Sequence, residues 1–254
     1  MGSPGPAPPP DAELRRRGHR RHGRKHPGRC AGAGETVNRR RLDARPRTFA
    51  TRSGTVLKRV ISRETIARRV RALGRKIARA IAPDERPLAV VVLQGAFVFA
   101  ADLLRHLPDE LGIEVGFLRC DSYGAGTRSK GRVVLLQDLD ARLDLRGRTI
   151  LLIDDILDSG LTLSYLVSHL KARGAERIRI CVLLRRKRRM RAPVPAVQAD
   201  FVGFDVDTGF YVGYGLDCAS RHRNLPDLAV LAATQRAAPF GNRPRRARKM
   251  ESAN

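Results

Sequence analysis

The chain has 254 residues, enough for one sizeable α/β domain with tails. It carries 50 Lys and Arg residues against 25 Asp and Glu residues, a formal net charge of +25. No apolar run approaches the roughly 20 residues of a membrane-spanning helix, so the composition argues against an integral helical membrane protein. The cysteines are far apart and form no CxxC pair, which predicts a reduced, cytoplasmic protein rather than a disulfide scaffold.

The two ends of the chain hold more than half of the excess positive charge. Residues 1–53 have a net charge of +10 and residues 236–254 a net charge of +5. The first segment is rich in Pro, Arg, His and Gly, and such a segment buries too little apolar surface to offset its chain entropy. We therefore expect disordered basic tails around a folded domain at 54–235. A solvated tail is the simplest interpretation of residues 1–53, with nucleic-acid contact and an organelle transit peptide as alternatives.

The folded part is predicted to begin with a helix. Ser62 fits an N-cap, and Pro83 lies just past the expected end. Between them, apolar residues recur at spacings of three and four: Ile66, Val70, Leu73, Ile77 and Ile81. The continuous apolar run Leu88–Leu93 then predicts a strand buried on both faces, and a helix is expected over about 97–107.

Further strands alternate with helical segments along the chain. Strands are expected at 113–120, 133–136, 149–153 and 179–184, and a helix at 161–173 that Gly174 closes. This alternation predicts an α/β fold, a doubly wound and mostly parallel sheet with helices on both faces. Ligands gather at the carboxyl ends of such strands. That rule singles out four segments: Gln94-Gly95, Asp121–Arg128, Asp154–Thr162 and Arg185–Arg191.

The segment Asp154-Asp-Ile-Leu-Asp-Ser-Gly-Leu-Thr162 carries the most specific chemistry. Ser159, Gly160, Leu161 and Thr162 open a helix, where free backbone amides and the helix dipole form a cradle for a phosphate. Adjacent carboxylates can accept hydrogen bonds from vicinal sugar hydroxyls, directly or through a metal. A third carboxylate, three residues on, can act as a base. The alternative, that the first two acids only cap the helix, fits three Asp in five residues poorly.

These residues resemble the phosphoribosyl-pyrophosphate signature of type I phosphoribosyltransferases, two acids followed by an Asp-[Ser/Thr]-Gly-x-Thr turn. The chain is similar to hypoxanthine-guanine phosphoribosyltransferases over about 57–231. The shared motifs are Leu93-Gln94-Gly95, the lid-like Ser122-Tyr123, Asp200–Phe204 with Phe210–Asp217 as a C-terminal purine hood, and Arg223-Asn-Leu225. The resemblance implies the type I fold with a small hood from the C-terminal and N-terminal ends of the domain. It also implies transfer of 5-phosphoribosyl from its pyrophosphate to hypoxanthine or guanine with Mg²⁺.

The resemblance also implies a role for each matching residue. Asp154 and Asp155 would hold the ribose hydroxyls, Asp158–Thr162 the 5′-phosphate, and Asp158 would be the general base. The other implied roles follow family positions: Gln94, Gly95 and Arg223 for pyrophosphate; Ser122 and Tyr123 for the lid; Lys187, Phe210, Tyr211 and Asp217 for the purine; Asp154, Asp155 and Asp217 for the metal.

Several positions depart from the family pattern. Gln94 stands where Lys or Arg is common, so an ionic contribution is missing there. Lys187 is the only lysine near the position that contacts the purine 6-oxo group, but a shift of one register would place Arg186 or Arg188 there. Cys218 and His222 stand where aromatic residues are common.

Two other functions stay open at this point. The basic surface is compatible with an RNA-binding regulator built on the same fold, and xanthine is an alternative base. The complete acid motif, lid and hood favour an enzyme, because a pure binding protein has no need of Asp158. The family resemblance implies a homodimer or homotetramer.

Overall fold

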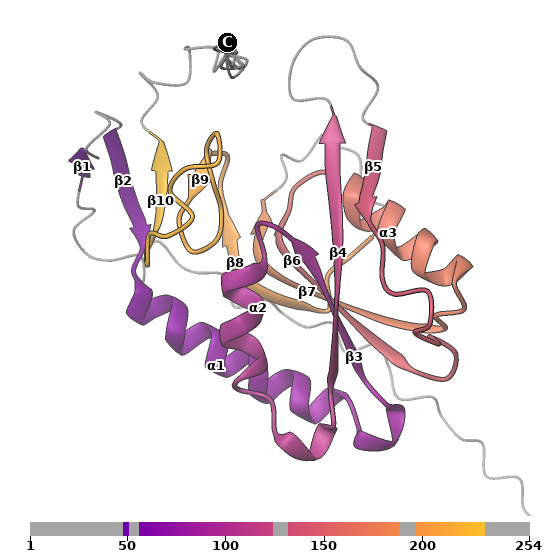
Figure 1. The fold of residues 1–254 in the computed structure, drawn as a ribbon. Helices are drawn as coiled ribbons and strands as arrows, with labels where there is room; N and C mark the ends of the chain where they lie inside the picture. Colours follow the sequence, from indigo (N-terminus) through magenta and orange to yellow (C-terminus); the bar gives the residue numbers. More distant parts are fainter. Residues whose placement is uncertain (1–47, 51–55, 124–131, 188–196, 232–254) are drawn as a thin grey trace, which may run out of the picture. The chain divides into compact units, whose positions relative to one another are not determined.

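A computed structural model describes residues 48–50, 56–123, 132–187 and 197–231. They form a six-stranded main sheet with helices on both faces and a separate four-stranded sheet (Figure 1). The predicted tails lie almost wholly outside these residues, as do most of the predicted lid and Arg188. Among the described helices, none is long and apolar enough to cross a membrane.

The elements agree with the predicted alternation, with shifted ends. The helices are α1 (Arg63–Ala80), α2 (Phe97–Leu104) and α3 (Leu161–Ala172). The strands of the main sheet are β3 (Leu88–Leu93), β4 (Glu114–Tyr123), β5 (Arg132–Gln137), β6 (Thr149–Leu157), β7 (Arg177–Arg186) and β8 (Phe201–Val206). The strands of the small sheet, which we call the hood, are β1 (Thr48–Ala50), β2 (Val56–Ile61), β9 (Tyr211–Val212) and β10 (Leu228–Leu231).

The main sheet confirms the doubly wound α/β prediction. Its strand order is β5-β4-β3-β6-β7-β8, and every neighbouring pair is parallel except β4 with β5. The chain runs outward from β3 to β4 and β5 and then returns to the other side of β3 as β6. The carboxyl ends of β3 and β6 therefore flank the point where the winding direction reverses, which is where such sheets bind ligands.

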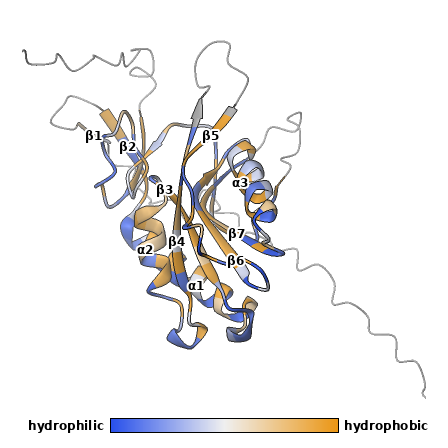
Figure 2. Cartoon of the chain, turned by 45° about the vertical axis from the view of Figure 1, so that its right-hand side comes forward, coloured by the Kyte–Doolittle hydropathy of each residue, from blue (hydrophilic) through white to orange (hydrophobic). Residues whose placement is uncertain are grey.

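Two hydrophobic cores hold the helices on the sheet. Ala89, Val91, Leu151 and Ile153 face α1 and α2, whereas the alternate side chains of β3 and β6 face α3. Strand β3 is accordingly hydrophobic along its length, and β6 is hydrophobic from Ile150 to Ile153 (Figure 2). Ser62 caps α1 as predicted, accepting a hydrogen bond from the Thr65 amide at 3.4 Å.

The hood combines strands from both ends of the domain, as predicted, but one predicted segment lies elsewhere. Asp200–Phe204 was expected in the hood, but Phe201–Val206 forms edge strand β8 of the main sheet, parallel to β7. The N-terminal part of the predicted hood consists of β1 and β2. Strand β1 lies inside the range predicted as a tail, because pairing with β2 stabilises a segment whose own composition is poor in apolar residues.

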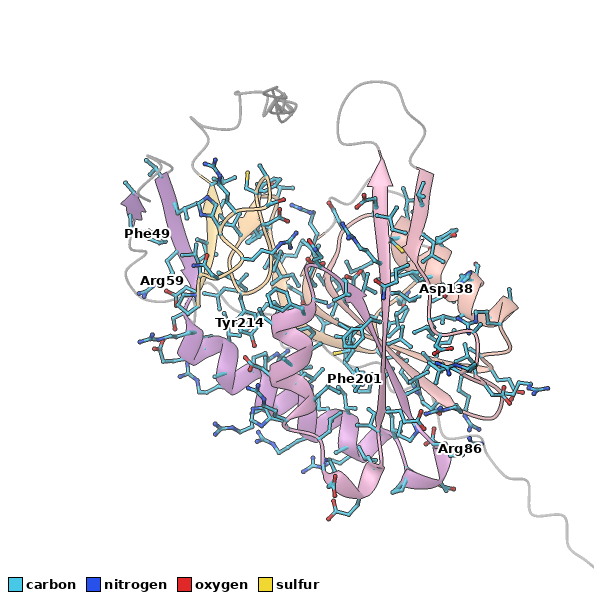
Figure 3. All side chains as sticks on the ribbon, in the orientation of Figure 1. Phe49, Arg59, Arg86, Asp138, Phe201 and Tyr214 are labelled. Atoms are coloured by element: carbon cyan, nitrogen blue, oxygen red, sulfur yellow. The ribbon has the colours of Figure 1, made fainter. Side chains whose placement is uncertain are left out.

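Tyr214 joins the hood to the main part of the fold. Its hydroxyl donates to Asp102 Oδ2 on α2 at 2.7 Å, and Figure 3 shows Tyr214 between the hood strands and α2. Gly215 lies next to it with φ of 100°, and a Cβ there would collide with the Gly95 carbonyl oxygen. The hood thus contacts the loop after β3 too closely for any side chain at position 215.

Candidate active site

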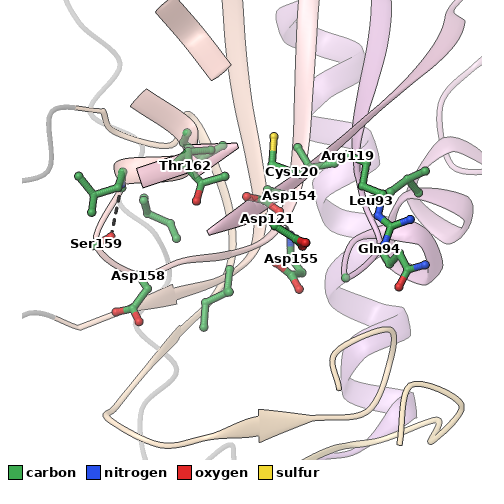
Figure 4. Close-up of a pocket in the computed structure, with 18 of the residues that line it drawn as sticks. Leu93, Gln94, Arg119, Cys120, Asp121, Asp154, Asp155, Asp158, Ser159 and Thr162 are labelled. Carbon is green, nitrogen blue, oxygen red and sulfur yellow. Dashed lines mark hydrogen bonds between the residues drawn. The ribbon is translucent and has the colours of Figure 1, made fainter. Parts of the chain in front are cut away.

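A pocket of about 530 Å³ opens at the carboxyl ends of β3, β4 and β6. It contains three of the four segments that the strand-end rule singled out, those beginning at Gln94, Asp121 and Asp154. Figure 4 shows Asp121, Asp154 and Asp155 between two groups of residues, with Ser159 and Thr162 on one side and Leu93, Gln94 and Arg119 on the other. The topology therefore brings together residues that are far apart in the sequence.

Asp154 and Asp155 belong to strand β6, not to the cap of the following helix. The strand continues to Leu157, four residues beyond its predicted end. Helix α3 begins at Leu161 with Gly160 at its N-cap position, and no side chain caps it. The alternative in which these acids serve as helix caps is therefore wrong.

The surroundings of the paired carboxylates disfavour their charged form. Asp154 is 7% exposed and accepts a hydrogen bond from the Asp155 amide at 2.9 Å. Burial, and then the neighbouring Asp155 carboxylate, raise the pKa of Asp154 well above its ordinary value. Hydroxyl donors or a cation at this point would favour the charged form.

The cradle at the start of α3 has the predicted form. Gly160 has φ of 84°, a left-handed conformation that suits glycine. The Ser164 amide already bonds to the Gly160 carbonyl at 2.8 Å, so the amides of Thr162 and Leu163 precede the first helical hydrogen bond. Ser159, Thr162 and Leu163 are among the residues that line the pocket, and Ser159 Oγ accepts a hydrogen bond from the Leu161 amide at 3.4 Å. Figure 4 shows Ser159 and Thr162 on the opposite side from Gln94.

The loop after β3 lies directly against the acid pair. A Cβ at position 95 would collide with the Asp155 carboxylate, so only glycine lets the backbone approach this closely. Arg223 Nη2 donates to Gln94 Oε1 at 3.5 Å, and its Nη1 donates to the Gly215 carbonyl at 2.7 Å. Asp217 contacts the same guanidinium at 2.8 Å. The structure thus groups Gln94, Gly95, Asp217 and Arg223 at one end of the pocket.

Asp158 is paired with a residue that the sequence analysis left as an alternative. Arg186 Nε lies 2.7 Å from Asp158 Oδ1, and Arg186 Nη1 donates to the Gly209 carbonyl at 3.1 Å. Lys187 instead lies 3.8 Å from Asp207 Oδ1, and neither Arg186 nor Lys187 is among the residues that line the pocket. The register of β7 therefore places Arg186, rather than Lys187, between Asp158 and the segment that carries Phe210.

Phe210 and Tyr211 lie outside the pocket lining. Phe210 is 46% exposed, and the Tyr211 hydroxyl donates to the Asp207 carbonyl at 3.0 Å. Of the predicted lid, only the backbone of Ser122 and Tyr123 is described, at the end of β4. Cys218 is buried in the hood core with Leu57, which accounts for a small residue at that position.

Arg119 and Cys120 line the pocket but had no predicted role. They are the last two residues of the strand predicted at 113–120, so the segment chosen by the strand-end rule began two residues too late. Asp121 was within a segment that the rule singled out, again without a role.

Fold and site together define the class. A doubly wound sheet that holds two strand-end acids opposite an amide cradle, at the reversal of winding, has the architecture of a phosphoribosyltransferase. The family described as Phosphoribosyl transferase domain matches residues 59–217 of this chain. The chain therefore belongs to the phosphoribosyltransferase family.

Individual relatives narrow this assignment to the hypoxanthine-guanine phosphoribosyltransferases, of which the chain is a member. It is 46% identical over 172 residues to the hypoxanthine-guanine phosphoribosyltransferase of Bacillus subtilis, covering 68% of this chain and 91% of that protein. The enzyme of the same name from Aquifex aeolicus is 39% identical over 178 residues, covering 70% and 96%. A crystal structure of a Bacillus anthracis hypoxanthine-guanine phosphoribosyltransferase gives a TM-score of 0.61 at 36% identity, covering 68% of this chain and 98% of that one.

Proposed function

We propose that the chain is a purine salvage enzyme that transfers the 5-phosphoribosyl group from phosphoribosyl pyrophosphate to hypoxanthine or guanine. The observation that carries the proposal is the position of Asp154 and Asp155 at the end of β6, facing the α3 cradle across one pocket. A ribose 5-phosphate matches this arrangement because its hydroxyls meet carboxylates while its phosphate meets free amides.

In the proposed reaction the C1–oxygen bond to pyrophosphate breaks, and its electron pair leaves with the pyrophosphate. N9 of the base forms the new bond to C1, and the proton that the base loses passes to the Asp158 carboxylate. Positive charge develops on the sugar and negative charge on the leaving group, so the site must hold both substrates in line. The acid pair suits the sugar side of this transition state.

The leaving pyrophosphate would occupy the Gln94 end of the pocket. Because Gly95 has no side chain, its backbone lies directly beside the acid pair. We expect its amide to donate a hydrogen bond to a pyrophosphate oxygen there. Arg223 would release part of its contact with Asp217 to bind phosphate oxygens, for which a planar guanidinium is well suited.

The base would lie between Phe210 and Arg186. Arg186 contacts both Asp158 and the Gly209 carbonyl, so its guanidinium lies between the proposed general base and the segment that carries Phe210. An arginine fits the O6 and N7 acceptors of a 6-oxopurine and is mismatched with the 6-amino group of adenine. We therefore assign the 6-oxo contact to Arg186 in place of Lys187, with Tyr211 and Asp217 beside the purine and Ser122-Tyr123 in the lid.

Magnesium fits the donor chemistry of the pocket. Among the described residues no group of three or more potential ligands is gathered at one point, so Asp154, Asp155 and Asp217 do not form a single metal cage. Mg²⁺ commonly binds one or two carboxylates together with substrate oxygens, and the Asp154-Asp155 pair and Asp217 each meet that need. When bound, the ion would neutralise charge on the pyrophosphate.

A homodimer or homotetramer is also part of the proposal. Four large apolar side chains on β4 and β5 are exposed by 37% to 49%: Val115, Phe117, Val134 and Leu136. Large apolar side chains exposed together on two paired strands favour an interaction site, and a second copy of the chain is the occupant that the family implies. Phe117→Glu should then lower the mass measured by light scattering.

The free thiols of Cys120, Cys181 and Cys218 support the predicted cytoplasmic location.

The function is tested by pyrophosphate release with a panel of bases. We expect turnover with hypoxanthine or guanine, none with adenine, and loss of turnover in Asp158→Ala. Xanthine turnover would broaden the substrate class. Absence of turnover with every base, together with tight and salt-dependent RNA binding, would establish the regulator alternative instead.

A further inference from the structure

Arg119 is a cationic side chain in the pocket for which the proposed function has no use so far. It lies near the end of β4, and its backbone pairs in parallel register with Leu93, the residue before Gln94. Neighbouring strands are about 4.8 Å apart. Figure 4 shows Arg119 beside Leu93 and Gln94, across the pocket from Ser159 and Thr162. Arg119 is therefore at the pyrophosphate end of the site.

Carboxylates outnumber arginines in the pocket lining, yet none of them is paired with Arg119. The pocket is lined by five carboxylates: Asp121, Asp154, Asp155, Asp158 and Asp217. The other lining arginine, Arg223, contacts Asp217 at 2.8 Å, and Asp158 is paired with Arg186. Within the described ranges, no ion pair or hydrogen bond engages the guanidinium of Arg119, which is exposed. An arginine that no carboxylate engages here is available to a bound anion.

The neighbouring Gln94 explains why a cation is needed at this point. Its neutral carboxamide is oriented by Arg223 and contributes no charge to the anion that the loop would hold. A pyrophosphate group gains negative charge as its bond to the sugar breaks, and a fixed cation beside it stabilises that charge. Arg119 and Arg223 flank Gln94 from two different elements, β4 and the hood.

We propose that Arg119 binds the pyrophosphate group of the substrate and supplies the positive charge that Gln94 lacks. The inference rests on the proposed function, because it uses that function's assignment of the pyrophosphate end. It goes beyond that function by assigning a pyrophosphate-binding residue on β4. It also predicts that a positive charge at position 94 can replace the one at position 119, because both residues would face the same ligand.

The test compares Arg119→Gln with Arg71→Gln. Arg71 is an exposed arginine on α1 outside the pocket, so this control removes the same charge elsewhere. Binding of inorganic pyrophosphate with magnesium is measured by calorimetry, and KM is measured for phosphoribosyl pyrophosphate and for the base. For Arg119→Gln we expect the pyrophosphate Kd and the phosphoribosyl pyrophosphate KM to rise about tenfold, while the base KM stays within about twofold.

A second variant separates charge from structure. Adding Gln94→Lys to Arg119→Gln should restore most of the lost pyrophosphate affinity, whereas a structural defect at position 119 would not respond. Equal pyrophosphate affinity in Arg119→Gln and Arg71→Gln overturns this inference and leaves the proposed function standing. Failure of the wild-type chain to bind pyrophosphate or turn over any base removes both.

Discussion

Arg186 Nε lies 2.7 Å from Asp158 Oδ1, and the same guanidinium reaches the Gly209 carbonyl beside Phe210. One side chain therefore links the proposed base catalyst to the hood. The neighbouring Lys187 points to Asp207 instead. The pair of positions makes a matched test, since the two side chains are adjacent, cationic and differently placed.

Arg186→Leu is expected to weaken purine binding. Loss of a charged hydrogen-bond donor costs about 1.5–3 kcal/mol, which corresponds to a ten- to hundredfold loss of kcat/KM for hypoxanthine or guanine. Lys187→Leu should change kcat/KM by less than about threefold, because its side chain is 43% exposed and is paired with Asp207 rather than with Asp158. The opposite ranking of the two variants would return the 6-oxo contact to Lys187.

Tyr214→Phe should destabilise the fold. The hydroxyl donates to Asp102 at 2.7 Å, and both burial and this hydrogen bond raise the pKa of Tyr214, so it stays a donor at neutral pH. Because Asp102 is partly exposed, we expect a loss of about 1 kcal/mol, or about 2–4 °C in Tm. Tyr165→Phe is the control, since Tyr165 is exposed and stacks on His169. Equal Tm values for the two variants would contradict the role of the hydroxyl.

The sequence predicted those parts of the fold that depend on local patterns. The apolar run Leu88–Leu93 predicted its strand because a strand buried on both faces is apolar at successive positions. The spacing of three and four after Ser62 predicted its helix because only one face of that helix is buried. The hood was only partly predictable. Strand β1 depends on backbone pairing with β2, and β8 depends on pairing with β7. Local composition does not determine which strand pairs with which.

The same distinction applies to the site. The motif from Asp154 to Thr162 was predictable because its residues are contiguous, whereas Arg119 enters the pocket only through the register of β4 with β3. The choice between Arg186 and Lys187 depended on a single residue of register in β7, which alternates side chains between faces. Sequence reasoning chose Lys187 and kept Arg186 as an alternative, whereas the structure places Arg186 beside Asp158.

Gly95→Ala should abolish most of the activity. The added methyl group would collide with the Asp155 carboxylate, so the loop or the acid must shift. A displacement near 1 Å at a reacting centre costs on the order of a hundredfold in rate. Gly209→Ala is a control for folding, because its Cβ would meet Tyr211 at 3.4 Å, an ordinary contact. Turnover of Gly95→Ala at the wild-type rate would show that this close approach is not needed.

Cys120 should react with iodoacetamide more slowly than an ordinary thiol. Burial, and then the nearby Asp154 and Asp121 carboxylates, raise the pKa of Cys120 to about 11. Since the thiolate is the reacting species, the rate should rise about tenfold per pH unit between pH 7 and 10 without levelling off. Mass spectrometry of the Cys120 peptide follows the reaction, with a free cysteine peptide as reference. A plateau below pH 9 would contradict the raised pKa, and protection by phosphoribosyl pyrophosphate would place the thiol beside the ligand.

Asp154→Asn should remove activity yet stabilise the fold. A carboxyl group whose pKa is raised on folding binds its proton more tightly in the folded state. Its destabilising effect therefore begins above the ordinary pKa of 3.8 and grows until the raised pKa is reached. Asparagine has no such penalty, so the gain in Tm over the wild-type chain should increase from pH 5 to pH 8.

We expect a higher Tm for Asp154→Asn than for the wild-type chain at pH 8 and a smaller difference at pH 5. The measurement is thermal unfolding in EDTA, which keeps metal ions from stabilising the wild-type acids. Asp121→Asn is the matched control, because its carboxylate lines the same pocket but is exposed. A Tm difference that is the same at both pH values, or a gain of equal size in Asp121→Asn, would mean that burial of Asp154 is not the cause. The predicted pairing of lost turnover with raised stability is expected where two carboxylates are held together for a ligand rather than for the fold.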